Sequence, residues 1–148
     1  MSLTILLLAA LLAQAEVSWA LKMWRCDPAF KIHDPEMALK QRRFSLTLAK
    51  AGGPLKWSTV SADGGKAHGS GKVLSLRPWT QQLQSTDEYG APLPAQPVPC
   101  VSVVAEVPSA PDFDRFSICQ MPKTIVWIPE HEDGMMKTDD VAKTALCH

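Results

Sequence analysis

The sequence lacks the short motifs that identify the commonest hydrolase and metal sites. It has no Gly-x-Ser-x-Gly nucleophile turn and no His-Glu-x-x-His zinc site, and its glycine-rich stretch lacks the Lys-Ser/Thr ending of a phosphate-binding loop. No two of the four cysteines stand at Cys-x-x-Cys spacing, and the four histidines are scattered, which disfavours zinc. We therefore expect no metal and no cofactor.

Long apolar runs are also scarce, since the single clear one lies at the N-terminus. Residues 3–13 form an apolar core too short to span a bilayer, followed by small residues at the spacing that signal peptidase reads. Cleavage after Ala15 and cleavage after Ala20 both fit, and we favour the second because Ala20 ends the low-polarity stretch. Residues 1–20 are thus predicted to be a removable signal peptide and residues 21–148 a single secreted domain.

The four cysteines all lie in the predicted mature chain. An even number in a small exported protein indicates disulfides rather than free thiols. Of the three possible pairings, we favour Cys26 with Cys147, which ties the chain ends together, and Cys100 with Cys119, which closes a short loop. Loop-closure entropy predicts about 3 to 5 kcal/mol of stabilisation from each bond.

The net charge is zero, but the charges are unevenly distributed along the chain. Residues 21–77 hold eleven Lys and Arg against four acidic residues, whereas residues 78–148 hold four against ten. A basic first half can meet phosphates, although a fold that pairs the two halves for solubility is the alternative. The candidate phosphate-contacting side chains, expected in or just after one helix, are Arg42, Arg43, Lys50, Lys56, Lys66 and Lys72.

A helix is predicted to start at Asp34-Pro35-Glu36, because Asp can cap it, Pro suits its first position and an acid suits its first turn. We expect it to run to about Ala51, although Phe44, Leu46 and Leu48 also alternate as in a strand.

The rest of the mature chain predicts loops and short strands. The polar, glycine-rich residues 61–71 predict a loop, and residues 78–99 a long surface excursion. The fold class expected is α+β, with one helix packed on a small antiparallel sheet and stapled by disulfides. The strands are expected at residues 72–76, 100–107, 113–119 and 124–128.

Several short motifs match one known family in chain order. Trp24-Arg25-Cys26 and Leu146-Cys147-His148 look like its cysteine-containing chain ends, and residues 105–108 look like its strand with a catalytic glutamate. Residues 122–127 and 134–138 are similar to the strands that carry its arginine and its second histidine. In these motifs the chain resembles the small secreted guanyl-specific ribonucleases of microbes and the fungal ribotoxins of the α-sarcin type.

The resemblance implies a site in which a glutamate base, a histidine acid and an arginine cleave RNA. Glu106 occupies the base position. The arginine and acid positions hold Thr124 and Thr138, and the first histidine falls on Gly71 or Lys72. Threonine neither shuttles a proton near neutral pH nor neutralises a phosphate, so we predict a catalytically degenerate protein, a pseudo-ribonuclease.

A ribonuclease scaffold without these groups resembles the RNase-like effectors of plant-pathogenic fungi. That resemblance implies a secreted virulence protein that enters host cells and binds host RNA or ribosome-associated proteins, and we expect it to be a monomer. Two alternatives are an active secreted ribonuclease that uses Glu106 with His68 or His131, and an extracellular binding domain with no nucleic-acid role.

Overall fold

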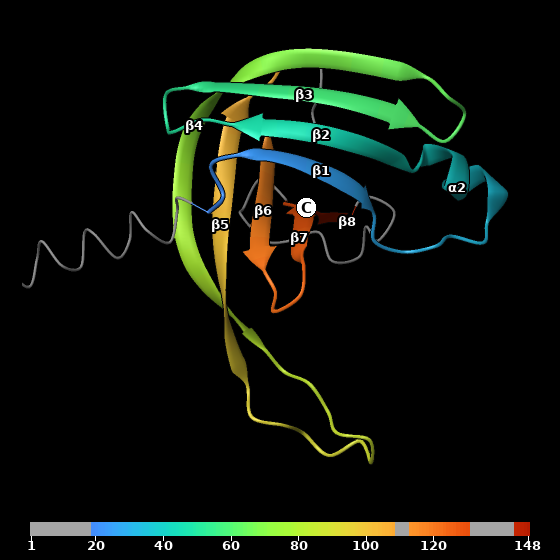
Figure 1. The fold of residues 1–148 in the computed structure, drawn as a ribbon, viewed down its shortest axis with the longest axis vertical. Helices are drawn as coiled ribbons and strands as arrows, with labels where there is room; N and C mark the ends of the chain where they lie inside the picture. The colour runs from blue at the N-terminus through green and yellow to red at the C-terminus, as the bar shows by residue number, and fades with distance from the viewer. Residues whose placement is uncertain (1–18, 109–112, 131–143) are drawn as a thin grey trace, which may run out of the picture.

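A computed structural model describes residues 19–108, 113–130 and 144–148 of the chain. Eight antiparallel strands follow one another around a closed barrel, in which each strand pairs with its sequence neighbours and β8 pairs with β1 (Figure 1). In the described part of the chain, the single helix is α2 (Pro35–Lys40). The strands are β1 (Met23–Pro28), β2 (Arg42–Leu48), β3 (Pro54–Ser61), β4 (Lys66–Leu83), β5 (Gln96–Glu106), β6 (Arg115–Gln120), β7 (Ile125–Pro129) and β8 (Ala145–Cys147).

The predicted α+β arrangement of one helix on a sheet is wrong, because the second half of the predicted helix contains strand β2 and the whole sheet closes into a barrel. The helix begins as expected, with the Asp34 carboxylate accepting hydrogen bonds from the first-turn N–H groups, but it ends at Lys40. The residues after Gln41 follow the period of two that is typical of a strand. Phe44, Leu46 and Leu48 all point into the barrel and are buried. Burial of alternate side chains in a closed sheet outweighs the local helix signals.

The predicted strands all overlap strands of the barrel, but two predicted loops are partly strand. Within residues 61–71, a tight turn is followed at Lys66 by β4. Within residues 78–99, β4 and β5 continue beyond the barrel as a two-stranded extension, which Figure 1 shows projecting from its lower end. We call residues 80–99, including the turn at its end, the arm.

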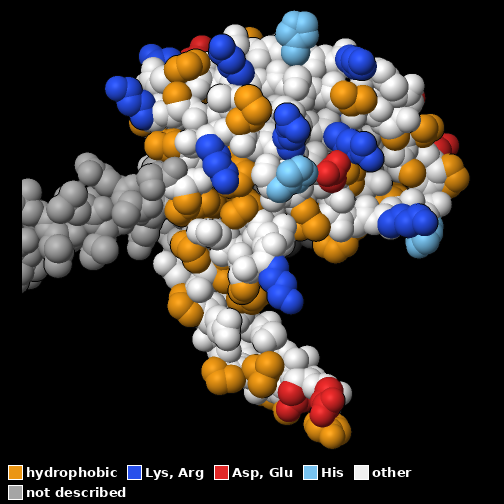
Figure 2. Space-filling view, viewed as in Figure 1, with side chains coloured by type: hydrophobic (Ala, Val, Ile, Leu, Met, Phe, Trp, Pro, Cys, Tyr) orange, Lys and Arg blue, Asp and Glu red, His pale blue; other side chains and the backbone are white. Residues whose placement is uncertain are grey.

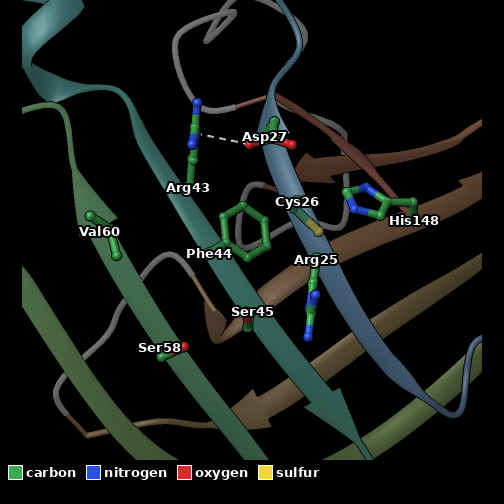
Figure 3. Close-up of a pocket in the computed structure, with 9 residues that line it drawn as sticks. All are labelled: Arg25, Cys26, Asp27, Arg43, Phe44, Ser45, Ser58, Val60 and His148. Atoms are coloured by element: carbon green, nitrogen blue, oxygen red, sulfur yellow. Dashed lines mark ion pairs between the residues drawn. The ribbon is translucent and has the colours of Figure 1, made fainter.

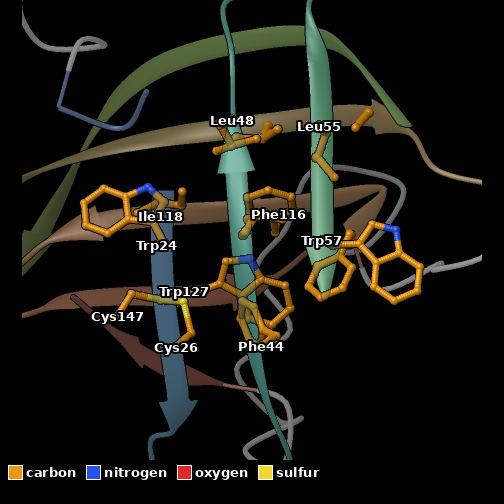
Figure 4. Packing of buried hydrophobic residues seen from close by; sticks show 14 of the residues in the cluster. Trp24, Cys26, Phe44, Leu48, Leu55, Trp57, Phe116, Ile118, Trp127 and Cys147 are labelled. Carbon is orange, nitrogen blue, oxygen red and sulfur yellow. A yellow bond between two sulfur atoms is a disulfide. The ribbon is translucent and has the colours of Figure 1, made fainter. Parts of the chain in front are cut away.

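The inside of the barrel is filled by the side chains that point inward. Trp24, Phe116 and Trp127 are almost completely buried there, as Figure 4 shows. Phe113 enters from the connection between β5 and β6, and its ring centroid lies 5.2 Å from that of Phe44 and 5.9 Å from that of Trp127. The inward residues therefore serve as the hydrophobic core, and outward residues remain for binding.

Both predicted disulfides are confirmed. Each joins residues that lie directly opposite on paired strands, with Cα atoms 4.1 Å apart. Cys26–Cys147 joins β1 to β8 inside the barrel, at the seam where the two ends of the described chain meet. Cys100–Cys119 joins β5 to β6 outside the core, beside the base of the arm.

Residues 1–18, which hold most of the predicted signal peptide, lie outside the described residues. Trp19 and Ala20 are described, and both pack against the barrel core. Ala20 is fully buried and its carbonyl accepts a hydrogen bond of 3.1 Å from the Trp24 indole. Cleavage after Ala15 would keep this contact and cleavage after Ala20 would remove it. Within the described ranges, no helical segment has the length and hydropathy of a membrane span.

Candidate functional site

Strands β1 to β4 turn a set of cationic side chains outward. In β3, for example, Leu55 and Trp57 point into the core and Lys56 between them points out. The strand register places such outward residues side by side on neighbouring strands. We call this surface the basic wall, and Figure 2 shows Lys and Arg side chains spread over this side of the barrel. Its cations are Arg25, Arg43, Lys56, Lys66 and Lys72, and the imidazole of His68 lies among them.

Few acidic groups offset this charge. Asp27 pairs with Arg43, with 3.1 Å between Oδ1 and Nε, and the two side chains are 51% and 79% exposed. An ion pair this exposed contributes little to stability. Glu106 stands at the β5 edge of the wall, directly opposite Lys72 in the strand register. The wall as a whole therefore keeps a positive charge.

A hollow of about 240 Å³ lies on the basic wall where β1, β2 and β3 run side by side (Figure 3). Arg25, Ser45 and Ser58 form one row across it, since each is the register partner of the next. Arg43 and His148 also line the hollow. Guanidinium groups next to hydroxyl donors can hold an anionic group such as a phosphate or a carboxylate.

Four of the six predicted phosphate-contacting residues belong to the basic wall. The guanidinium of Arg42 instead lies over the ring of Phe113, 5.4 Å from its centroid, and Lys50 lies in the turn between β2 and β3. The expectation that all six lie in or just after one helix is wrong, because the segment after Lys40 is extended. The four residues on the wall are Arg43, Lys56, Lys66 and Lys72.

Sequence reasoning missed Arg25 and placed His68 in a loop. Both residues lie in segments where inward and outward side chains alternate. In β1, Arg25 stands between the buried Trp24 and Cys26, a pattern that identifies it as an outward strand residue. His68 was hidden by the neighbouring glycines, of which Gly69 makes room for the ring of Trp57 on the adjacent strand.

Of the described residues predicted for the ribonuclease-like site, Glu106 and Lys72 stand directly opposite each other on paired strands, whereas His68 and Thr124 lie elsewhere. Glu106 is exposed and faces Lys72 across the strand pair. His68 lies four residues from Lys72 along β4, which corresponds to about 13 Å of extended strand. Thr124 lies in the turn between β6 and β7.

Two further predicted residues, His131 and Thr138, lie outside the described residues. Their part in a ribonuclease-like site stays a prediction, as does the degenerate character of that site.

The buried carboxylate of the described structure is Glu130 rather than Glu106. Glu130 is 4% exposed and accepts hydrogen bonds from the hydroxyl of Ser102, at 3.0 Å, and from that of Ser117. Both serines lie on strands β5 and β6, on the side opposite the barrel core. Across the described ranges, no group of three or more metal-binding side chains is present.

Comparison with known proteins gave no match to a protein-family model, a curated protein or a solved structure. The function must therefore be inferred from the surface itself. The surface that stands out is the basic wall with its hollow.

Proposed function

We propose that the protein is an exported binding protein whose basic wall holds the phosphate backbone of RNA without cleaving it. The observation that carries this proposal is the concentration of five Lys and Arg side chains on the outer side of four consecutive strands. In a barrel whose strands follow sequence order, a charge asymmetry along the chain becomes a charge asymmetry across the surface. Five of the eleven Lys and Arg residues of the basic first half thus share one surface.

The side chains of the basic wall indicate which part of an RNA strand it would contact. Apart from Asp27 and His68, its outward side chains are cationic, hydroxyl-bearing or aliphatic. The strongly exposed aromatic residues of the described chain, Phe30 and Tyr89, both lie elsewhere. Proteins that read single-stranded bases usually stack them on aromatic rings, whereas charge and hydroxyl contacts recognise the backbone. We therefore expect binding that depends strongly on salt and weakly on base sequence.

The export part of the proposal rests on the two disulfides, which pair all four cysteines. Such bonds are typical of proteins that fold in an oxidising compartment. Mass spectrometry of the secreted chain should find both bonds and an N-terminus at Glu16, which follows the Ala15 site. Four free thiols or an uncleaved N-terminus would remove the export part.

Binding without cleavage is supported by the separation of Glu106 from His68, which leaves the proposed base without that acid. The purified protein should not cleave RNA above a buffer control. Cleavage that is abolished by Glu106→Gln would instead favour the ribonuclease alternative. The effector role and the ribosome-associated partners stay predictions of the resemblance alone.

The binding test is fluorescence anisotropy with labelled single-stranded RNA of different base compositions at several salt concentrations. Affinity should fall steeply with salt, and removal of two wall cations in Lys56→Ala with Lys66→Ala should flatten the log–log slope by up to about 1.4, at about 0.7 per lost contact. These two residues suit the test better than Arg42, whose stacking on Phe113 couples it to the core.

The matched control is Lys31→Ala with Lys123→Ala, which removes the same charge from exposed positions off the wall. It should leave the salt slope unchanged if the wall is the binding surface. Absence of binding near physiological salt, or equal effects of the two double variants, would refute the proposal.

A further inference from the structure

The arm ends in a turn that is held by its own hydrogen bonds. The Asp87 carboxylate accepts hydrogen bonds of 2.9 Å from the backbone N–H groups of Tyr89 and Ala91, and Gly90 takes the positive φ of 80° that the turn requires. A turn fixed in this way loses little conformational entropy on binding.

The turn presents a carboxylate and an aromatic ring to solvent. Glu88 is exposed, and Tyr89 is 88% exposed. The arm contains the acidic residues Asp87 and Glu88 and no Lys or Arg. Tyrosine is among the residues that most often anchor protein interfaces, because it offers a large ring at low entropic cost. The end of the arm therefore has the chemistry of a contact surface for a basic, partly apolar hollow.

The hollow on the basic wall is both basic and partly apolar. Arg43 is already paired with Asp27, and Arg25 lines the same hollow together with Val60, which is 42% exposed. Figures 1 and 2 show that the arm points away from β1, β2 and β3 of its own barrel, with acidic side chains at its end. The arm of one molecule is therefore placed to reach the wall of another.

We propose that the end of the arm of one copy docks in the hollow on the basic wall of a second copy. Glu88 then faces Arg25, and the ring of Tyr89 packs against Val60. If both copies exchange arms, the contact is made twice around a two-fold axis and closes as a dimer. The predicted monomer would then be the main species only at low protein concentration. Since arm and RNA would use the same wall, each should displace the other.

The test is sedimentation velocity of the full mature protein without RNA, from about 1 μM to about 1 mM, at low and high salt. We expect a reversible monomer–dimer equilibrium that weakens at high salt, because the contact is charged and exposed at its rim. Glu88→Arg and Arg25→Glu should each raise the dimer Kd by about tenfold or more. The double variant with both reversals should restore most of the affinity.

Matched controls reverse charges at exposed positions off the arm and the hollow, in Asp114→Arg and Lys31→Glu. They should leave the dimer Kd unchanged. A monomer at every concentration, or a dimer that ignores the reversals at Glu88 and Arg25, overturns the inference. RNA binding is measured separately, so a monomer that binds RNA removes only this inference, and a dimer that does not bind RNA removes only the proposed function.

Discussion

Strands β2 and β3 on one side of the barrel differ from β5 and β6 on the other in how they are buried. Along β2 and β3, inward residues are buried and outward ones are mostly open to solvent, whereas most residues of β5 and β6 are buried on both faces. The outward residues of the second pair include the Cys100–Cys119 disulfide and the serines that hydrogen-bond to Glu130. The barrel thus has a side that serves stability and a side that is free to bind.

The two disulfides offer the largest test of this comparison. Cys26→Ser with Cys147→Ser opens a loop with a sequence separation of 121 residues, whereas Cys100→Ser with Cys119→Ser opens one of 19. Loop-closure entropy predicts losses of about 5 and about 3 kcal/mol in the free energy of unfolding, respectively. Urea unfolding of both double variants measures the difference. A larger loss from the short loop would contradict the expectation that loop length sets the contribution of each bond.

The second largest expected loss of stability comes from replacing the buried Glu130. Glu130→Ala leaves the buried hydroxyls of Ser102 and Ser117 without their acceptor, and we expect a loss of about 1 to 3 kcal/mol in the free energy of unfolding. The exposed Glu106 is the matched control, for which Glu106→Ala should change stability by less than about 0.5 kcal/mol. Equal losses in thermal or urea unfolding would mean that the buried hydrogen bonds of Glu130 to the two serines do not stabilise the barrel.

The smallest expected effect is a change in the pKa of Asp63, in the turn between β3 and β4. Hydrogen bonds from the Ser61 hydroxyl and from the backbone N–H of Gly65 lower the Asp63 pKa from its ordinary value of 3.8. Because the folded pKa is the lower one, the stabilisation is fully present above pH 3.8 and is lost as the pH falls through the folded pKa.

Ser61→Ala removes the largest cause of this shift, so the Asp63 pKa should rise toward its ordinary value. An NMR titration of the Asp63 carboxyl group measures it. Ser58→Ala, on the same strand but directed into the hollow, should leave this pKa unchanged. A pKa that does not move in Ser61→Ala would show that the hydroxyl is not responsible.

Local signals in the sequence were sufficient for part of the fold. The even number of cysteines and their positions predicted both disulfides, and Asp34 correctly marked the start of the helix. The predicted fold class was wrong because the segment around Phe44 fits two patterns. Phe44 and Leu48 have the spacing of four that suits a helix face, whereas Leu46 between them completes the alternation of a strand. Only the pairing of β2 with β1 and β3 decides between the two, and that pairing is a long-range property.

The candidate site was predictable in composition but not in arrangement. Arg43, Lys56, Lys66 and Lys72 could be identified because cations are concentrated in the first half of the chain. Their common face depends on the strand register, which no single segment contains.

The most direct test of the central claim is an NMR titration of the isotope-labelled protein with a short single-stranded RNA. We predict that the amide shifts which move belong to the basic wall, around Arg25, Arg43, Lys56 and Lys66, and that they return toward their free positions as salt is added. Shifts centred on the outer face of β5 and β6, with the wall unchanged, would contradict the account.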